Sequence, residues 1–337
     1  MAIMGMGVAG SYLMARLAKT GGHDVTGYEM MPAERHDSIC AWGTIRPVLE
    51  EFCRKVDVDF GRFLIHDGRK MRVNMAGSGV KFDIGLHGLC TYNKLALIKE
   101  FIKDADVRYG RPPKLAELEG EYDMIVDCTG FHRAYLPRLK EDFFLPTYEY
   151  KVEYEDGVPY DDFYIEPFPG MSGYFWYFPL GERWAHVGAG DYNKNHIKAT
   201  DDFLKKHGGS ILQTKGRPIR LATPNKCKPF YNGKVVGVGE SIGTVYALLG
   251  EGIIPSMQCA EIFLDNMDDL AAYERAVDEH YKVYGRVFNF VRSKIRKDFR
   301  LVRSLPDFMA IFRYMKRHED RFGMDIRMAD LIKVARA

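Results

Sequence analysis

The sequence lacks the apolar runs that span membranes and the paired cysteines that hold small secreted domains together. No segment approaches the stretch of about 18 apolar residues that crosses a bilayer, and no signal peptide precedes the first motif. The six cysteines are scattered without a Cys-x-x-Cys pair, and the ten histidines are equally dispersed. These absences argue against a disulfide framework and a structural zinc site, so we expect reduced thiols, no metal and a cytoplasmic protein.

Charge of one sign is also lacking. The formal net charge is only +2, and we expect no nucleic-acid partner. The 337 residues are enough for two domains or one large one. Aromatic residues, by contrast, are frequent at 13%. They indicate either a large apolar or planar ligand or an aromatic-rich core, and composition leaves both open.

The most informative motif is Gly-x-Gly-x-x-Gly at residues 5–10. An apolar segment predicted to be helical follows it, and then a short strand that ends on Glu29, 19 positions after the last glycine. In a dinucleotide site Gly5 allows the tight turn, Gly7 lets a pyrophosphate approach the backbone, and Gly10 lets helix and strand pack closely. The helix N-terminus attracts the phosphates and Glu29 accepts hydrogen bonds from a ribose. The pattern therefore predicts a dinucleotide site.

Two short segments are predicted to lie near such a cofactor, each with a structural alternative. Residues 40–44, Cys-Ala-Trp-Gly-Thr, read either as a loop against a planar ring with a thiol nearby, or as a buried structural cysteine beside a core tryptophan. Thr129 and Gly130 end an apolar strand. Such a turn either lets backbone approach a cofactor or simply ends the strand.

A second pair of segments indicates that the cofactor fold resumes late in the chain. Residues 233–240 form a predicted buried strand that ends in Gly-Glu, and a carboxylate there can bind a ribityl hydroxyl. Residues 250–254 open a glycine-started helix. A helix N-terminus of this kind can stabilise negative charge on a reduced isoalloxazine.

Between these parts, residues 145–190 alternate as strands rich in Tyr and Phe. We interpret them as a β-sheet layer inserted into the α/β domain. Within it, residues 173–179 read Gly-Tyr-Phe-Trp-Tyr-Phe-Pro. This run is predicted either to wall an apolar ligand chamber or to belong to the core.

The C-terminal part is predicted to be helical and basic. Eleven basic residues lie between 282 and 317, against two acidic ones. Apolar residues recur there at spacings of three and four, which gives one apolar face: Tyr284, Val287, Phe288, Val291, Ile295 and Phe299. Such a helix either lies on an anionic membrane surface, at the inner face of the membrane, or packs on the protein with a solvated basic face.

Three stretches, taken in order, resemble the geranylgeranyl reductase family of FAD-dependent oxidoreductases, especially archaeal digeranylgeranylglycerophospholipid reductases. They are the N-terminal motif with Glu29, the run at 173–190 and the segment 239–253, and the likeness covers about residues 1–265. Three positions depart from the family pattern. Glu240 replaces an aspartate, Ala247 replaces a proline, and Tyr92 replaces an arginine, with Lys94 nearby.

The resemblance implies an α/β, Rossmann-like FAD-binding fold of glutathione-reductase type, similar to hydroxybenzoate hydroxylase. An inserted antiparallel β-sheet substrate domain with a hydrophobic tunnel, and C-terminal helices, complete the expected chain. The expected boundaries are 1–135 and 230–265 for the FAD-binding domain, 136–229 for the substrate domain and 266–337 for the helical region.

The resemblance also implies residue roles. Cys40 is expected in the active site, where it places substrate or relays a proton. The expected substrate wall is Tyr174, Trp176, Phe178 and Pro179, and no metal ligand is expected. The residues expected to bind FAD are Gly5, Gly7, Gly10, Glu29, Ala41, Gly43, Thr44, Lys94, Thr129, Gly130, Gly239, Glu240, Gly250, Gly252 and Ile253.

The implied activity is hydride transfer from reduced flavin to C=C bonds of an isoprenoid or prenylated lipid, with a proton from Cys40 or water. Only one dinucleotide motif is present, so the external reductant is expected to be NAD(P)H docking without its own domain, or a ferredoxin-like protein. Two other readings stay open. One is a flavin monooxygenase of the hydroxybenzoate hydroxylase type, and the other is a non-catalytic flavin- or isoprenoid-binding protein.

Overall fold

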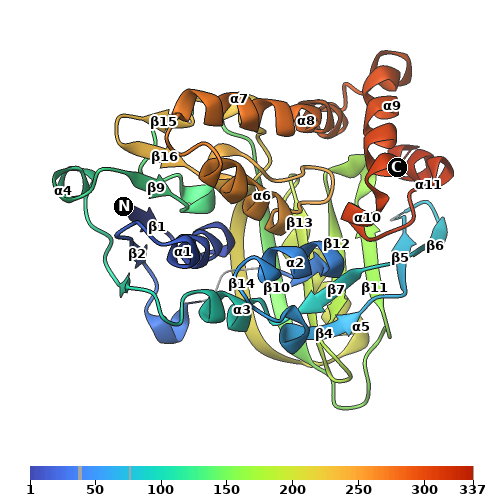
Figure 1. Cartoon of the computed structure of the whole chain (residues 1–337). Helices are drawn as coiled ribbons and strands as arrows, with labels where there is room; N and C mark the ends of the chain where they lie inside the picture. The colour runs from blue at the N-terminus through green and yellow to red at the C-terminus, as the bar shows by residue number, and fades with distance from the viewer. Residues whose placement is uncertain (37–39, 76, 337) are drawn as a thin grey trace.

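The computed structural model describes residues 1–36, 40–75 and 77–336. Two large sheets lie side by side and helices cover them, with the N-terminal part on the left of Figure 1 and the last helices on the right. The first sheet has six strands in the order β15-β16-β9-β1-β2-β8. Its strands are β1 (Ala2–Met4), β2 (Thr26–Glu29), β8 (Val107–Tyr109), β9 (Ile125–Asp127), β15 (Tyr231–Asn232) and β16 (Val235–Gly237).

This sheet is parallel except for the β15–β16 pair, and β1 lies at its centre between β9 and β2. Its three residues are no more than 1% exposed, as expected for a parallel sheet covered on both faces. The return strand β16 pairs with β9, so the late segment rejoins the first part of the chain as predicted. The nearby helices are α1 (Val8–Thr20), α2 (Arg46–Arg54), α3 (Lys94–Phe101), α4 (Leu115–Glu121) and α6 (Ile253–Leu264).

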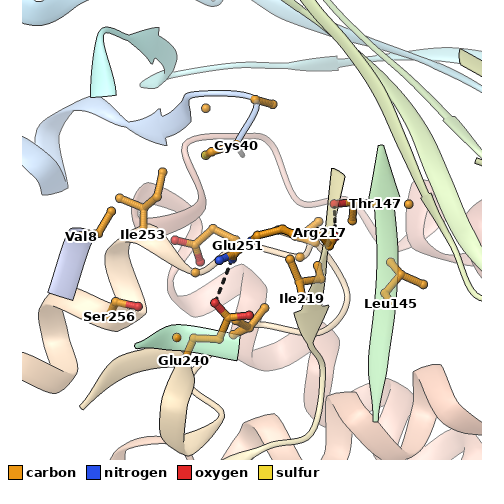
Figure 2. Close-up of a pocket in the computed structure, with 18 of the residues that line it drawn as sticks. Val8, Cys40, Leu145, Thr147, Arg217, Ile219, Glu240, Glu251, Ile253 and Ser256 are labelled. Atoms are coloured by element: carbon orange, nitrogen blue, oxygen red, sulfur yellow. Dashed lines mark hydrogen bonds and ion pairs between the residues drawn. The ribbon is translucent and has the colours of Figure 1, made fainter. Parts of the chain in front are cut away.

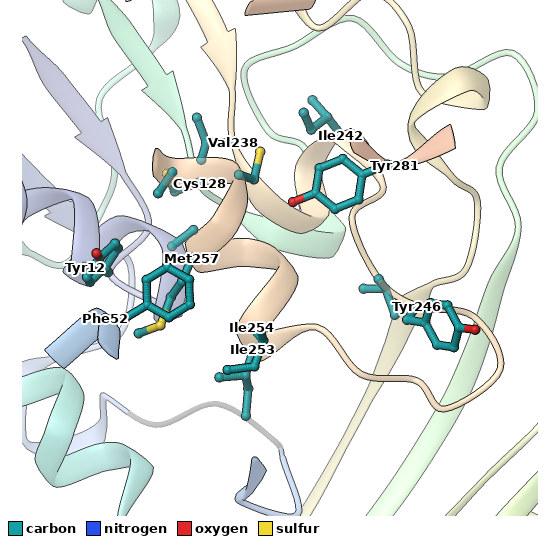
Figure 3. Close-up of a cluster of buried hydrophobic side chains, with 14 of the residues drawn as sticks. Tyr12, Phe52, Cys128, Val238, Ile242, Tyr246, Ile253, Ile254, Met257 and Tyr281 are labelled. Atoms are coloured by element: carbon teal, nitrogen blue, oxygen red, sulfur yellow. The ribbon is translucent and has the colours of Figure 1, made fainter. Parts of the chain in front are cut away.

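Helix α6 packs against α1 and forms the centre of this core. Figure 3 shows its Met257 beside Tyr12 and Phe52, and its Ile254 near the start of the helix, all of them buried. Two polar ties reinforce the contact. The Tyr12 hydroxyl donates to Glu261 at 2.6 Å, and Arg16 Nε lies 2.7 Å from the same carboxylate.

The second sheet has seven strands in the order β14-β10-β13-β12-β11-β5-β6. They are β5 (Lys70–Asn74), β6 (Lys81–Gly85), β10 (Phe144–Glu153), β11 (Phe163–Pro167), β12 (Gly173–Pro179), β13 (Trp184–Asp191) and β14 (Ser210–Arg220). All neighbours are antiparallel except β11 and β5, which are parallel. Helix α5 (His196–His207) packs on one face, where Phe203 lies against Phe175 and Tyr177. The other face is turned toward the first sheet.

A small third sheet links the two large ones. It has the order β3-β7-β4 and consists of β3 (Gly43–Ile45), β4 (Leu64–Asp67) and β7 (Leu89–Tyr92). Short 3₁₀ helices complete the connections: η1 (Ala33–Arg35), η2 (Phe60–Phe63), η3 (Gly130–His132), η4 (Pro169–Met171), η5 (Pro224–Lys226) and η6 (Gly239–Ile242).

The C-terminal helices are α7 (Leu270–His280), α8 (Lys282–Ile295), α9 (Leu301–Arg317), α10 (Glu319–Phe322) and α11 (Met328–Arg336). Most of the apolar face predicted for this region lies on α8, and there it is buried: Tyr284, Val287, Phe288, Val291 and Ile295 are each at most 9% exposed. The core therefore occupies that face, and it is not presented to a membrane. No helix in the described part of the chain is long and apolar enough to cross a bilayer.

Candidate active site

A cavity of about 1320 Å³ is lined by residues of both large sheets and of the C-terminal helices. Figure 2 shows part of its wall, with Val8, Cys40, Arg217, Glu240 and Ile253 drawn from five separate segments. Pockets for one drug-sized ligand usually measure about 300–1,000 Å³. This cavity therefore has room for a large cofactor together with part of a second ligand.

The glycine motif forms one end of the cavity. Gly5 has φ +91° and donates its N–H to the Tyr28 carbonyl at 2.7 Å. A Cβ on Gly10 would lie 2.0 Å from the Gly5 carbonyl oxygen, so only glycine permits this helix–strand approach. Gly7, by contrast, has no atom within 4 Å of its Cβ position, and it lines the cavity.

Gly7 is the N-cap of α1, which has no side-chain cap and no acidic residue in its first turn. An N-terminus of this kind offers free N–H groups and a positive dipole end to an anion. The open space at Gly7 lets a pyrophosphate approach this backbone. Gly10 itself does not line the cavity and acts through packing.

Glu29 ends β2 at the same side of the cavity, and two main-chain donors fix its carboxylate. Met6 N–H donates to Oε2 and Met31 N–H donates to Oε1, each at 2.9 Å. A carboxylate has about four acceptor positions, so each oxygen retains capacity for a hydroxyl. This arrangement fits the predicted role of Glu29 in binding a ribose.

The loop that begins at Cys40 forms the facing wall, and Cys40, Ala41, Gly43 and Thr44 all line the cavity. The Trp42 N–H donates to Cys40 Sγ at 3.4 Å, and the Trp42 backbone has a left-handed conformation, with φ +58°. A Cβ on Gly43 would lie 2.5 Å from the Phe178 ring, so Gly43 allows this loop to contact β12. The buried Thr44 hydroxyl has no hydrogen-bond partner among the described residues, which leaves it available to a bound group.

Thr129 and Gly130 also line the cavity, on the turn that follows β9. Asp127, which is fully buried, organises this turn. Its Oδ1 accepts the Thr129 N–H at 3.0 Å and hydroxyl at 2.6 Å, and its Oδ2 accepts two further N–H groups. Gly130 has φ +60°, and its Cβ position lies 3.1 Å from Glu240 Oε2.

Glu240 lines the cavity, but its carboxylate is already paired. Oε2 accepts from Arg217 Nη2 and Oε1 from the Arg220 N–H, both at 2.9 Å. The first of these bonds is the dashed line between Arg217 and Glu240 in Figure 2. Arg217 lies on β14 and also lines the cavity, a residue that sequence reasoning did not identify. Gly239 does not line it, and its Cβ position lies 3.1 Å from the Ala9 Cβ.

The start of α6 supplies Gly250, Gly252 and Ile253 to the cavity wall. Glu251, between the glycines, forms an ion pair with Arg321 of α10 at 2.5 Å, and their side chains are 15% and 12% exposed. Burial alone would lower the pKa of Arg321, but the Glu251 carboxylate outweighs burial and raises it above its ordinary value. Arg321 is therefore a fixed cation at the cavity, and no sequence pattern indicated it.

The predicted substrate wall lies on the cavity-facing side of β12. Tyr174, Trp176 and Phe178 line the cavity, while Pro179 does not; its carbonyl accepts the Thr91 hydroxyl at 2.6 Å. The Tyr174 hydroxyl donates to the Leu249 carbonyl at 2.5 Å and so connects the sheet to the segment before α6.

The polar groups of the same sheet face gather on two strands. Strands β10 and β14 contribute Thr147, Glu149, Lys215 and Arg217 together with the apolar Leu145 and Ile219, whereas an apolar half formed by β12, β11, β5 and β6 contributes aromatic and aliphatic side chains. The C-terminal helices cover the apolar half. Cavity-lining residues there include Met71, Ile84, Ile165, Ile295, Met315 and Val334. The apolar chamber therefore includes helices that were expected to lie outside the substrate site.

The structure thus brings together all the predicted site residues except Gly10, Gly239 and Pro179, which support the wall from behind. Lys94 is buried at the start of α3 and lines the cavity. Tyr92, at the position of the family's arginine, is only 1% exposed and packs on Phe60 with ring centroids 5.5 Å apart. The open backbone at Gly7, the oriented Glu29 and the unpartnered Thr44 hydroxyl fit an FAD molecule.

No family model matches the chain. Among curated proteins, it is 31% identical over 121 residues to digeranylgeranylglycerophospholipid reductase 2 of Methanothermobacter thermautotrophicus. The match covers 33% of this chain and 31% of that relative, so it spans less than a third of the relative's length.

Solved structures match over most of the chain. A geranylgeranyl bacteriochlorophyll reductase-like protein from Thermoplasma acidophilum has a TM-score of 0.69 at 17% identity, over 87% of each chain. A flavin-dependent halogenase from Brevundimonas has a TM-score of 0.64 at 15% identity, over 87% of this chain and 77% of that one. A probable FAD-dependent monooxygenase from Pseudomonas aeruginosa has a TM-score of 0.63 at 14% identity, over 91% and 98%.

These structures confirm the predicted α/β FAD-binding fold. Together with the curated match, they also confirm the resemblance to geranylgeranyl reductases. At these identities the structural likeness is evidence of fold, which is shared by reductases, halogenases and monooxygenases.

Proposed function

We propose that this protein is an FAD-dependent reductase that saturates C=C bonds of an isoprenoid chain or prenylated lipid. The observation that carries the proposal is the continuity of one cavity. One end has the glycine motif and Glu29, and the other is an apolar chamber walled by Phe178 and by aliphatic residues of β5, β6 and the C-terminal helices. A cofactor at the first end would have its ring at the mouth of an apolar chamber.

The residues around that mouth suit a flavin ring. The α6 N-terminus, with Gly252 as its N-cap, lies at the cavity wall, where its positive dipole end would favour negative charge on a reduced ring. FAD would supply the hydride, and the protein would supply position and electrostatics. Most side chains that wall the chamber are apolar, which favours a hydrocarbon over a polar substrate. The charged residues that the C-terminal segment adds to the cavity wall are Arg321, Asp325, Arg327 and Asp330.

The external reductant in this proposal is NAD(P)H or a ferredoxin-like protein, because the chain has one dinucleotide motif. Membrane contact, in the same proposal, is electrostatic. Basic side chains of α8 such as Lys282 and Arg286 are exposed, whereas its apolar face is buried. The substrate would then be taken from an anionic membrane surface without insertion of the helix.

The test is an anaerobic flavin titration. The purified protein is loaded with FAD and reduced with dithionite, a geranylgeranyl lipid is added without oxygen, and the visible flavin band is followed. Return of the band, with a mass gain of two hydrogens in the lipid, supports the reductase. If the band returns only when oxygen is admitted, the lipid is not the acceptor and a monooxygenase is favoured. Flavin that no donor reduces, or that no acceptor reoxidises, favours a binding protein.

Cys40 provides a second prediction within this proposal. Its partly exposed thiol lines the cavity beside the loop backbone, so a Cys40→Ala variant should retain FAD. If the thiol places substrate or relays a proton, turnover in the anaerobic assay should fall by at least about tenfold, or a different double bond should be reduced. Unchanged rate and product would make Cys40 a packing residue.

A further inference from the structure

We propose that Glu149 and His186 form the proton donor of this site, an inference that rests on the proposed reductase function. Saturation of a C=C bond adds one hydride, which reduced FAD supplies, and one proton to the adjacent carbon. The second requirement falls on an acid within reach of the substrate. The sequence pointed only to Cys40 or water for this role.

Glu149 and His186 are a buried carboxylate and imidazole on the cavity-facing side of the sheet. Their side chains are 2% and 4% exposed, and Glu149 lines the cavity. His186 Nδ1 lies 3.1 Å from Glu149 Oε1, an ion-pair contact whose angles fall short of a hydrogen bond. His186 Nε2 is buried too, and it has no hydrogen-bond partner among the described residues.

The indole of Trp176 fixes the other carboxylate oxygen. Trp176 Nε1 donates to Glu149 Oε2 at 3.2 Å, across the intervening strand β13. Trp176, Gly188 and Glu149 lie opposite one another in the registers of β12, β13 and β10. A Cβ on Gly188 would lie 2.6 Å from the indole ring, so glycine at this position lets the ring reach the carboxylate. A predicted substrate-wall residue therefore holds Glu149 in place.

The loop of Cys40 closes over this pair. The Trp42 ring packs edge-on against His186 with centroids 4.9 Å apart, and Lys151 Nζ lies 5.2 Å from the Trp42 centroid. The other charged groups on this sheet face are Lys215 and Arg217 of β14 and Glu153 of β10, which pairs with Arg183, and the titratable group of the loop is Cys40. Burial without full hydrogen bonding is costly for a charged group, and such sites are common where proton transfer occurs.

Glu149 loses its proton to the substrate and regains one through His186. The π-electron pair of the alkene forms a C–H bond with the Glu149 proton as the neighbouring carbon receives the hydride, and the Glu149 O–H bond breaks. The carboxylate that results accepts the Trp176 N–H and the contact of His186. Protonated His186 then returns a proton to Glu149 Oε1, and solvent reprotonates His186.

The principal test compares Glu149→Gln with the wild type in the anaerobic single-turnover assay. Glutamine keeps the acceptor for Trp176 but cannot deliver a proton, so reoxidation by lipid should slow by about 10²- to 10⁴-fold. FAD binding and dithionite reduction should be unchanged. Glu153→Gln is the matched control, because Glu153 is on the same strand but pairs with Arg183 and does not line the cavity. Reoxidation of Glu149→Gln within about threefold of wild type would overturn the proposal.

A Trp176→Phe variant separates proton donation from positioning. It removes the indole but retains Glu149 and His186, so its reoxidation should be much faster than that of Glu149→Gln. Equal loss in both variants would show that Glu149 acts only by holding the wall, and would overturn the assignment.

Tryptophan emission gives a readout that needs neither FAD nor turnover. The chain has three tryptophans, and two of them contact the pair. In a Trp184→Phe background, emission of the FAD-free protein should show a pH-dependent step that His186→Asn removes and Cys40→Ala retains. A pH-dependent step that persists in His186→Asn would overturn the proposal that Glu149 and His186 form a proton-binding pair. If lipid never reoxidises wild-type flavin, the proposed function fails and proton donation with it, whereas the emission step still reports whether the pair binds a proton.

Discussion

Replacing Gly7 by alanine should separate cofactor binding from folding. A Cβ at Gly7 meets no protein atom within 4 Å and points into the cavity, whereas a Cβ at Gly10 would lie 2.0 Å from the Gly5 carbonyl oxygen. The two glycines belong to one motif, three residues apart. Their substitution should nevertheless have different physical consequences.

The size of the Gly7 effect follows from the groups it disturbs. A methyl group there keeps the pyrophosphate from the first N–H groups of α1, and a hydrogen bond to a charged group contributes about 1.5–3 kcal/mol. Loss of one such bond weakens FAD binding by about 10- to 150-fold. The stability of the FAD-free protein should change by less than about 1 kcal/mol. Alanine is a poorer N-cap than glycine, but it also lowers the conformational entropy of the unfolded chain, and the two effects oppose each other.

Gly10→Ala should behave in the opposite way. Overpacking of this kind costs about 1–3 kcal/mol or more, so the FAD-free protein should itself be destabilised. The assays are FAD titration by fluorescence quenching and thermal unfolding of the FAD-free protein. Gly120→Ala, on the exposed α4 with open space at its Cβ, is the control and should bind FAD normally. Wild-type FAD affinity in Gly7→Ala would refute the placement of the pyrophosphate at this helix.

Three further predictions concern the core, the pH dependence of stability and the chamber. Arg321→Met leaves the partly buried Glu251 carboxylate without its ion pair and should destabilise the protein by about 1–3 kcal/mol, whereas adding Glu251→Gln should recover part of that loss in urea unfolding. Burial would raise the pKa of Glu261, but Arg16, Lys55 and Tyr12 outweigh it and lower the pKa below 4.5. The carboxylate therefore stabilises the fold above pH 4.5, and this contribution disappears as the pH falls below that value. The urea midpoint of Glu261→Gln should therefore fall less than that of the wild type as the solution is acidified. An equal fall in both proteins would contradict the assignment. Val334→Trp fills part of the chamber from α11, so the variant should prefer shorter isoprenoids in competition assays. An unchanged preference would show that the isoprenoid binds elsewhere.

Local patterns were enough to predict the strand, turn and helix around the glycine motif. The roles of Gly5, Gly7, Gly10 and Glu29 depend on a strand, a turn and a helix that are adjacent in the chain, and the structure places these elements as expected. The aromatic run at 173–179 was likewise predicted to be a strand, because alternation of side chains is a local property.

Contacts between distant segments could not be predicted in this way. Arg217 and Glu240 are 23 residues apart, and Arg321 and Glu251 are 70 residues apart, with no spacing rule that joins them. The chamber wall on the C-terminal helices was missed for a similar reason. Their apolar periodicity showed that one face would be covered but did not say whether protein, ligand or membrane would cover it.

Strand pairing shows the same limit. The region predicted to form the inserted sheet began at residue 145, so the place of β5 and β6 in the second sheet was not predicted. β5 pairs in parallel with β11, whose partner residues lie 92 positions further along the chain at Phe163↔Met71. Parallel pairing over such a separation leaves no turn signal in the sequence.

The strand order has a consequence for how the chain is made and divided. The second sheet takes β5 and β6 from before β9 of the first sheet, and the first sheet takes β16 from after β14 of the second. The second sheet is complete only when synthesis has passed about residue 220, and the first only after β16 (Val235–Gly237) has been made. Sheets that depend on such distant pairings form slowly, and their strand edges stay unpaired until the last strand is added. No single cut therefore separates the two sheets and leaves both intact, and exchange of substrate modules between relatives would require several junctions, not two.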